Sequence, residues 1–272
     1  MSEDEGFTIE LTAKQAAVTF LFVGLVFGGA SGMAAGAFAF GGDTQLSGND
    51  GSGGESGTST GGSDSGSGLV TLDGVEFEGE PSKGDSDAPI KIVEVNEFGC
   101  PFCAEFQGVD ASARIPIDQM DIAGSLESQY IDSGEVELIS KDYPVPNLHP
   151  NGPEAHKAAN CVYEHEKDSF WEYHDELFER RDQWMASGQG NTEETFRQIS
   201  NDLGLDTETV MQCYDNSENQ EANNDKSELT TSVGRLGTPT FFVGNREKGF
   251  VKISGAQPLP RFEEAINTVQ NQ

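Results

Sequence analysis

One short motif constrains the fold of this chain more than any other feature: a pair of cysteines that directly follows an apolar run. The run Ile90-Lys91-Ile92-Val93-Glu94-Val95 is rich in β-branched residues and predicts a buried strand. Cys100-Pro101-Phe102-Cys103 comes next, and Pro101 suits the first position of a helix because proline has no N–H. The sequence therefore predicts a strand, a short loop and a helix that begins at the cysteine pair.

The two cysteines lie where a thiol becomes reactive. A sulfur at a helix N-terminus faces unpaired N–H groups and the positive end of the helix dipole, which favour the thiolate. Cys100 has this place, whereas Cys103 lies one turn further into the helix, where it is shielded and placed to attack a mixed disulfide on Cys100. The pair can therefore alternate between dithiol and disulfide.

Two other interpretations of the pair stay open. Half of a Cys₄ zinc site has the same spacing, but such sites combine two cysteine pairs, and Cys161 and Cys213 stand singly far along the chain. An inert structural disulfide is the second alternative, although a pair between a strand and a helix is the redox arrangement. We therefore predict redox chemistry, with no metal and no cofactor.

Two further features bear on this site. Glu94 lies inside the apolar run, so we expect a carboxylate beneath the cysteine helix, with a pKa raised by burial and suited to relaying protons. If that strand is instead an edge strand, Glu94 reaches solvent and Glu97 is the substitute candidate. The tract Gly237-Thr238-Pro239-Thr240 precedes a β-prone run, and because proline cannot donate to a β-ladder, Pro239 fits a strand edge or a cis turn.

Two histidines are further candidates for catalysis. His174 lies on the aromatic face of a predicted helix, so we expect it to pack in the core. His149 lies in a loop rich in proline and asparagine, where solvent exposure is expected. Neither is predicted to take part in the reaction.

The N-terminal part of the chain predicts a membrane anchor. Residues 16–40 are apolar or small throughout, and as a helix they are long enough to cross a bilayer. A cleaved signal peptide is the alternative, because Ala37-Phe38-Ala39 fits a cleavage site, but such peptides usually have a shorter apolar region after a basic segment. Lys14 on the N-terminal flank places residues 1–15 in the cytoplasm and the rest of the chain on the extracellular side of the cell membrane.

The remainder divides into a linker and a folded domain. Residues 41–68 are almost entirely Gly, Ser, Thr, Asp and Asn, and we expect a disordered, flexible linker. From residue 69 onward, β-prone and helical segments follow one another, with a long helical stretch at about 150–235 between two β-prone parts. We therefore predict an α/β domain over 69–272 with an inserted helical subdomain.

The charge of the chain indicates which environment it works in and which partners it can bind. With 47 Asp and Glu against 16 Lys and Arg, the net charge is −31, which argues against binding to nucleic acid. At about 1 M salt the Debye length is only about 3 Å, so the self-repulsion of such a surface is screened. We interpret the acidity as the salt adaptation of a halophilic protein, with an acidic protein from an ordinary organism as the alternative.

Cys161 and Cys213 both fall in the predicted helical stretch. In an exported protein two such cysteines are more often bridged than free, so we expect a structural disulfide between them. The alternative is a pair of buried, reduced cysteines that behave as small apolar residues.

Several of these features occur together in an order that resembles a DsbA-type member of the thioredoxin superfamily. They are Gly-Asp-x-x-Ala-Pro at 84–89, the strand with Glu94, the Cys-Pro-Phe-Cys motif, the aromatic helix at 170–174, and Gly-Thr-Pro-Thr-Phe-Phe at 237–242. The resemblance covers about residues 69–270 and implies a thioredoxin-like fold with an inserted helical subdomain.

The resemblance also implies roles for single residues. Cys100 is then the attacking, substrate-linked cysteine, Cys103 is the resolving cysteine and Glu94 is the buried acid of the family. Pro239 matches the cis-proline that packs against the cysteine pair, and the Thr238 backbone pairs with the substrate peptide, next to Pro101 and Phe102. Phe102 stands where the strongly oxidising DsbA has histidine, so that an imidazole able to stabilise the thiolate is missing from this motif.

From these features we expect an exported, membrane-tethered thiol-disulfide oxidoreductase that forms disulfides in reduced secreted proteins. In this family a membrane quinone-linked partner usually carries out the re-oxidation. A disulfide isomerase or reductase of the same fold is the near alternative, because small differences in potential decide the direction of exchange. A non-catalytic thioredoxin-like binding module is the other alternative.

Overall fold

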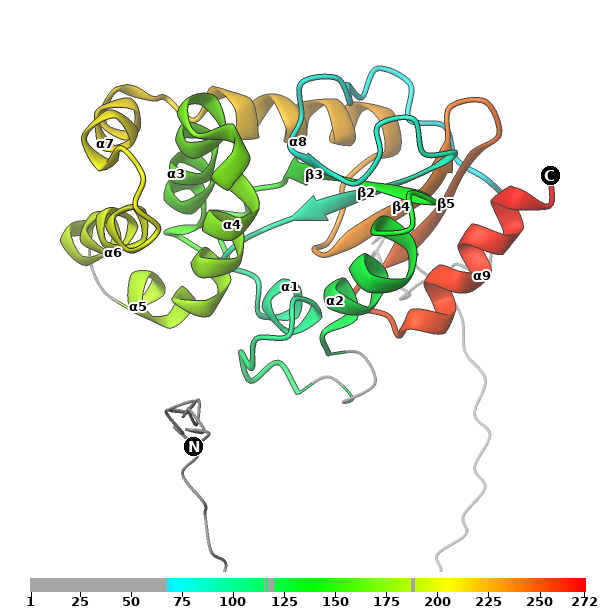
Figure 1. The fold of residues 1–272 in the computed structure, drawn as a ribbon, viewed down its shortest axis with the longest axis horizontal. Coiled ribbons are helices and arrows are strands. Elements are labelled where there is room, and N and C mark those ends of the chain that lie inside the picture. The colour runs from blue at the N-terminus through cyan, green and yellow to red at the C-terminus, as the bar shows by residue number, and fades with distance from the viewer. Residues whose placement is uncertain (1–67, 115, 117–119, 187–188) are drawn as a thin grey trace, which may run out of the picture. The chain divides into compact units, whose positions relative to one another are not determined.

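The computed structural model describes residues 68–114, 116, 120–186 and 189–272 (Figure 1). The predicted cytoplasmic segment (1–15), the predicted anchor (16–40) and nearly all of the predicted linker (41–68) lie outside the described residues. Within the described ranges, no helix has both the length and the apolar character that a bilayer crossing requires. The three N-terminal assignments therefore stay predictions.

The described part of the chain contains one sheet with five strands, ordered β1-β3-β2-β4-β5. β2 and β3 run parallel, and the other neighbouring strands pair antiparallel. The second strand, predicted at 90–95, has partners on both sides and is buried on both faces, which explains its nearly continuous apolar sequence. The strands are β1 (Ser82–Lys83), β2 (Ile90–Asn96), β3 (Val136–Asp142), β4 (Thr240–Asn245) and β5 (Gly249–Ser254).

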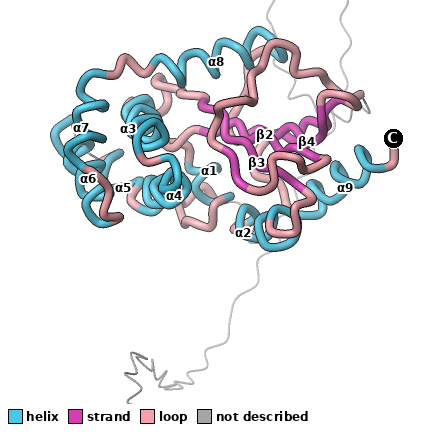
Figure 2. Tube along the Cα trace, turned by 45° about the horizontal axis from the view of Figure 1, so that its top comes forward, coloured by secondary structure: helices cyan, strands magenta, loops and turns pink. Residues whose placement is uncertain are grey.

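Helices cover both faces of this sheet (Figures 1 and 2). On one face, Ile92 packs with Phe106 and Ile266, and on the other face Val95 packs with Leu229. The helices of the described residues are α1 (Pro101–Phe106), α2 (Ile122–Leu126), α3 (Gly152–His165), α4 (Phe170–Glu179), α5 (Arg181–Met185), α6 (Gln189–Asp202), α7 (Thr207–Asn216), α8 (Gln220–Val233) and α9 (Leu259–Gln270).

The helical insertion that the sequence predicts between the two parts of the sheet is confirmed. Helices α3 to α8 connect β3 to β4, and α3 to α7 gather beside the sheet (Figure 1). They enclose an apolar core of their own, which includes Trp184 and Phe196. Cys100 and Cys103 belong to this same cluster, although they come from the sheet part of the fold. The cysteine pair therefore lies where the insertion meets the sheet.

Candidate active site

The cysteine pair follows β2 and opens α1. Cys100 is the N-cap residue of α1, and its N–H donates to the Glu97 carbonyl oxygen at 2.9 Å, which closes the turn after the strand. Pro101 comes next, at the first helical position, where a backbone N–H would have no acceptor within the helix. Both thiols are free, with Cys103 fully buried and Cys100 4% exposed. Phe102 between them is 44% exposed, so the motif offers an apolar side chain to an incoming polypeptide.

The surroundings favour the thiolate of Cys100 and the thiol of Cys103. Hydrogen bonds from Cys103, from His149 and from the Thr238 side chain stabilise the Cys100 thiolate and lower its pKa to about 4 despite its burial. Burial raises the pKa of Cys103 well above that of an ordinary thiol, and the neighbouring Cys100 raises it further. At neutral pH the first sulfur is therefore a nucleophile and a good leaving group, while the second stays protonated.

The turn before β4 faces the Cys100 sulfur. Pro239 follows a cis peptide bond, and the Thr238 carbonyl oxygen accepts from the Cys100 thiol at 3.3 Å. These residues are far from Cys100 in sequence, and the antiparallel pairing of β4 with β2, which sets Thr240 opposite Val95, brings them to the cysteine pair. The structure thus places Cys100, Thr238 and Pro239 together, as the DsbA resemblance implies.

Glu94 is buried beneath the cysteine helix, as the apolar strand predicts. Its Oε1 accepts from the Gln107 side chain at 3.1 Å, and its Oε2 has no hydrogen-bond partner among the described residues. Burial raises the pKa of Glu94 to about 7, and the charge of His174 only partly opposes that rise. His174 itself lies in the aromatic core, with its ring against Phe98. A carboxyl group that titrates near neutral pH can take up and return a proton during thiol exchange.

With this geometry in place, comparisons with known proteins assign the chain. A family model described as thioredoxin matches residues 76–267, which spans the strand, the cysteine pair, the insertion and the turn at Pro239. The chain belongs to the thioredoxin family. The disulfide bond formation protein D of Bacillus subtilis is 25% identical to it over 180 residues, covering 62% of this chain and 70% of that protein.

Solved structures of thioredoxin-like proteins share the fold. The crystal structure of oxidised BdbD from Bacillus subtilis superposes with a TM-score of 0.59 at 20% identity, covering 75% of this chain and 100% of that one. The α-DsbA1 of Wolbachia pipientis superposes with a TM-score of 0.57 at 22% identity, covering 72% and 94%. The family match and the curated relative confirm the resemblance and the assignment as a thiol-disulfide oxidoreductase, and the solved structures show that the fold is shared.

Two residues of this thioredoxin-family site, His149 and Arg181, escape the sequence analysis as members of it, and Glu97 entered that analysis only as a substitute for Glu94. Arg181, at the start of α5, donates through Nε and Nη2 to the Gly99 carbonyl oxygen at 3.0 and 2.7 Å. His149, expected in solvent, is only partly exposed and lies against Gly99. The glycine directly before Cys100 is the local signal that something packs closely there, but nothing in the sequence says what.

Glu97 is a second fully buried carboxylate at the motif, in addition to Glu94 rather than in its place. Its Oε1 accepts from the Gly99 N–H at 2.9 Å and its Oε2 from the Val145 N–H at 2.5 Å. His156 of α3 lies 3.7 Å from Glu97 and 2.7 Å from Asp142. Burial opposes their ionisation, but these contacts outweigh it, so the pKa of Glu97 is lowered and the pKa of His156 is raised to about 10.

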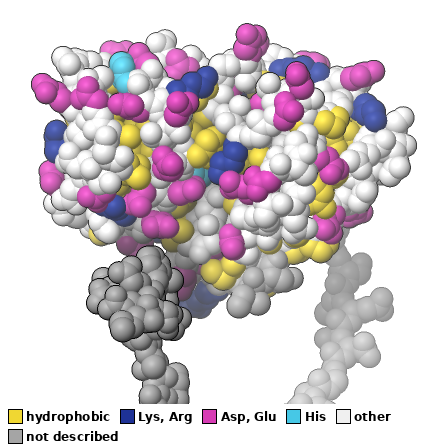
Figure 3. Space-filling model, in the orientation of Figure 1, with side chains coloured by type: hydrophobic (Ala, Val, Ile, Leu, Met, Phe, Trp, Pro, Cys, Tyr) yellow, Lys and Arg dark blue, Asp and Glu magenta, His cyan; other side chains and the backbone are white. Residues whose placement is uncertain are grey.

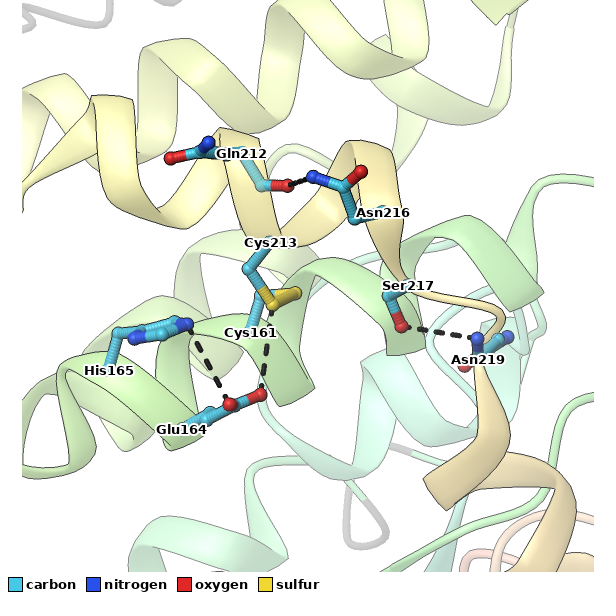
Figure 4. The surroundings of a disulfide bond; sticks show 8 residues. All are labelled: Cys161, Glu164, His165, Gln212, Cys213, Asn216, Ser217 and Asn219. Carbon is cyan, nitrogen blue, oxygen red and sulfur yellow. Dashed lines mark hydrogen bonds and ion pairs between the residues drawn. A yellow bond between two sulfur atoms is a disulfide. The ribbon is translucent and has the colours of Figure 1, made fainter.

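A disulfide joins Cys161 of α3 to Cys213 of α7, where the sequence predicts a structural bridge (Figure 4). It fastens two helices of the insertion, with a Cα–Cα distance of 5.7 Å. Glu164, His165 and Cys213 bring potential metal-ligand atoms within 4.8 Å of one another. Because the Cys213 sulfur is bonded to Cys161, it is not a thiolate, and the three residues do not make a metal site in this form of the protein.

Proposed function

We propose that this protein is an exported disulfide oxidase, tethered to the cell membrane by residues 16–40, that forms disulfides in reduced secreted proteins. The observation that carries the direction of the reaction is the environment of Cys100, which lowers the pKa of its thiol to about 4. A stabilised thiolate favours the dithiol form of the pair over its disulfide. The disulfide form is correspondingly a strong acceptor of electrons from other thiols.

The proposed reaction begins with the Cys100–Cys103 disulfide. A substrate thiolate attacks the Cys100 sulfur, the bond between the two cysteines breaks, and Cys103 leaves as a thiolate that takes up a proton. Cys103 is fully buried, so the attack is directed to Cys100. Glu94, whose pKa is about 7 because of burial, is the group suited to supply that proton.

A second substrate thiolate then attacks the substrate sulfur of the mixed disulfide. The substrate disulfide forms and Cys100 leaves as the stabilised thiolate, so that two substrate thiols are oxidised and the cysteine pair is reduced. The Thr238 backbone, which faces Cys100, is placed to pair with the substrate chain at this stage. Each turnover leaves a dithiol, and we propose a membrane quinone-linked partner as the group that re-oxidises it.

The tether and the location follow from the N-terminal sequence. An apolar stretch at 16–40 and a Gly/Ser/Asp-rich linker at 41–68 suit a catalytic domain held outside the membrane. Acidic side chains are spread over the face of the domain shown in Figure 3, in keeping with work in concentrated salt. Fractionation of cells that express the full chain tests the tether, because a cleaved protein is released in shortened form and an anchored one stays with the membrane at full length.

Oxidative refolding of a reduced, disulfide-containing protein tests the activity itself, in about 1 M salt. The wild-type protein is expected to accelerate refolding, and the Cys100→Ser variant is not. The Cys103→Ser variant cannot form the Cys100–Cys103 disulfide, so it is not expected to accelerate refolding either. If the wild-type protein is no faster than the Cys100→Ser variant, the domain is a binding module. If it accelerates only the repair of scrambled disulfides, it is an isomerase.

A further inference from the structure

The cysteine motif carries no imidazole, yet the fold supplies one. Phe102 occupies the position between the cysteines that could have held a histidine, and it is exposed. His149 lies in the loop between β3 and α3, where its side chain packs against Gly99, the residue directly before Cys100, and it is among the groups that lower the pKa of Cys100. An imidazole therefore lies beside the cysteine pair, on a segment that is separate in sequence from the motif.

The close approach of this loop depends on Gly99. A Cβ atom on Gly99 would lie 2.5 Å from the Cβ and 2.8 Å from the Cγ of His149, which is closer than real Cβ contacts allow. Because glycine has no side chain, His149 lies directly on the peptide that leads into Cys100. A larger residue at position 99 would push the loop and its imidazole away.

The loop is held in place by a chain of hydrogen bonds that starts at the motif. Glu97 accepts from the Gly99 N–H and, through its other oxygen, from the Val145 N–H. The carbonyl oxygen of Val145 in turn accepts from the His149 N–H at 2.9 Å. On its other side the His149 carbonyl accepts from the N–H of Gly152, the first residue of α3, at 2.9 Å. One buried carboxylate thus ties the cysteine loop and the histidine loop together.

We propose that His149 is a further catalytic residue of this enzyme, which stabilises the Cys100 thiolate in place of a histidine within the motif, and that Glu97 is its positioning residue. The role rests on the proposed oxidase function. When the second substrate thiolate attacks the mixed disulfide, the bond between substrate and Cys100 breaks and its electron pair stays on the Cys100 sulfur. An N–H of the His149 imidazole donates to that sulfur as its charge develops, and no proton is transferred.

Titration of the reduced protein tests this role without any turnover. The pH dependence of Cys100 alkylation gives its pKa, and equilibration with glutathione gives the redox equilibrium constant of the pair. The His149→Ala variant is expected to raise the Cys100 pKa by about one unit or more. The equilibrium constant for oxidising substrate thiols then falls about tenfold per unit, which makes the potential about 30 mV more negative.

Matched variants separate this effect from a loss of structure. His165→Ala removes a histidine at the far end of α3, and it is expected to leave the Cys100 pKa and the equilibrium constant unchanged. Phe102→His, added to His149→Ala, is expected to lower the Cys100 pKa again, because it restores an imidazole beside the sulfur. Glu97→Gln is expected to raise the pKa in the same direction as His149→Ala, and adding both changes is expected to give less than the sum of the two.

The possible results distinguish a failure of the His149 role from a failure of the oxidase function. If His149→Ala leaves both the pKa and the equilibrium constant at their wild-type values, His149 has no catalytic role, whether or not the enzyme is an oxidase. If the alanine variant does not fold, His149→Gln carries the same test, because it keeps the size of the side chain and removes the imidazole. If the wild-type protein fails to oxidise thiols while His149→Ala still shifts the Cys100 pKa, the oxidase function fails and the residue's effect on the thiolate stands.

Discussion

Reducing the Cys100–Cys103 disulfide is expected to stabilise the folded domain at neutral pH, the opposite of what the loss of a disulfide usually does. In the folded dithiol form the pKa of Cys100 is lowered from 9.0 to about 4. At pH 7 the unfolded thiol is still protonated, so about three pKa units of stabilisation are present, or about 4 kcal/mol at about 1.4 kcal/mol per unit. Opening a disulfide loop of only about four residues removes about 2 kcal/mol on the chain-entropy model. The reduced form is therefore expected to be more stable by about 2 kcal/mol.

The same calculation predicts that the oxidised form becomes more stable than the reduced form at acid pH. A lowered folded-state pKa contributes stability that is complete above the unfolded pKa and is lost as the pH falls toward the folded pKa. The thiolate contribution thus shrinks by about 1.4 kcal/mol per pH unit below neutrality and equals the disulfide contribution near pH 5.5, at about 2 kcal/mol. At pH 4 the oxidised form is expected to be the more stable one.

Urea unfolding at pH 7 and at pH 4, in constant high salt, measures both differences through the fluorescence of the fully buried Trp184. The Cys161→Ala/Cys213→Ala variant is the control, because it confines the redox change to the active-site pair. An oxidised form that is the more stable one at pH 7 would refute the reasoning, since it would mean that the Cys100 thiolate is not stabilised by the fold. A difference that does not change between the two pH values would refute it equally.

Three further predictions concern the surroundings of the cysteine pair. In the wild-type protein, Cys103 is expected to release a mixed disulfide faster as the pH rises through about 7, because the Glu94 carboxylate accepts the Cys103 thiol proton above that pH. The Glu94→Gln variant is expected to lose this rise in rate, which a stopped-flow pH profile measures. Arg181→Met leaves the Gly99 carbonyl oxygen without its two donors and is expected to lower the free energy of unfolding by about 1–3 kcal/mol. The control Arg197→Met removes an exposed ion pair and is expected to change that free energy by less than about 1 kcal/mol, and urea unfolding curves compare the two variants. Removing the Cys161–Cys213 disulfide is expected to lower that free energy by about 4 kcal/mol on the chain-entropy model, and an unchanged denaturation midpoint would contradict it.

Much of the fold could be predicted from local patterns. The strand at 90–95 is apolar because it is buried on both faces, and the helix at the cysteine pair begins at a proline. The long helical stretch between the two parts of the sheet was also predictable, because helical periodicity is a local property of the chain. The apolar strand likewise predicted that Glu94 is buried, since an edge strand of that composition would be unusual.

His149 shows what local patterns miss. A loop rich in proline and asparagine usually lies in solvent, and the prediction of an exposed His149 was wrong for that reason. The loop instead lies against Gly99, because Glu97 hydrogen-bonds both segments and His156 holds that carboxylate in its charged form. Such a contact depends on parallel pairing between β2 and β3, which sets the ends of the two strands side by side.

The sequence by itself determined which sulfur is reactive. The order of strand, cysteine pair and helix places Cys100 at a helix N-terminus, where unpaired N–H groups favour a thiolate. Only the tertiary structure decided how strongly that thiolate is stabilised, because His149 and Thr238 reach it from other parts of the chain. The physical reason is range: a helix end acts on the residue next to it, whereas hydrogen bonds to a sulfur require atoms that the packing of distant segments brings within a few ångströms.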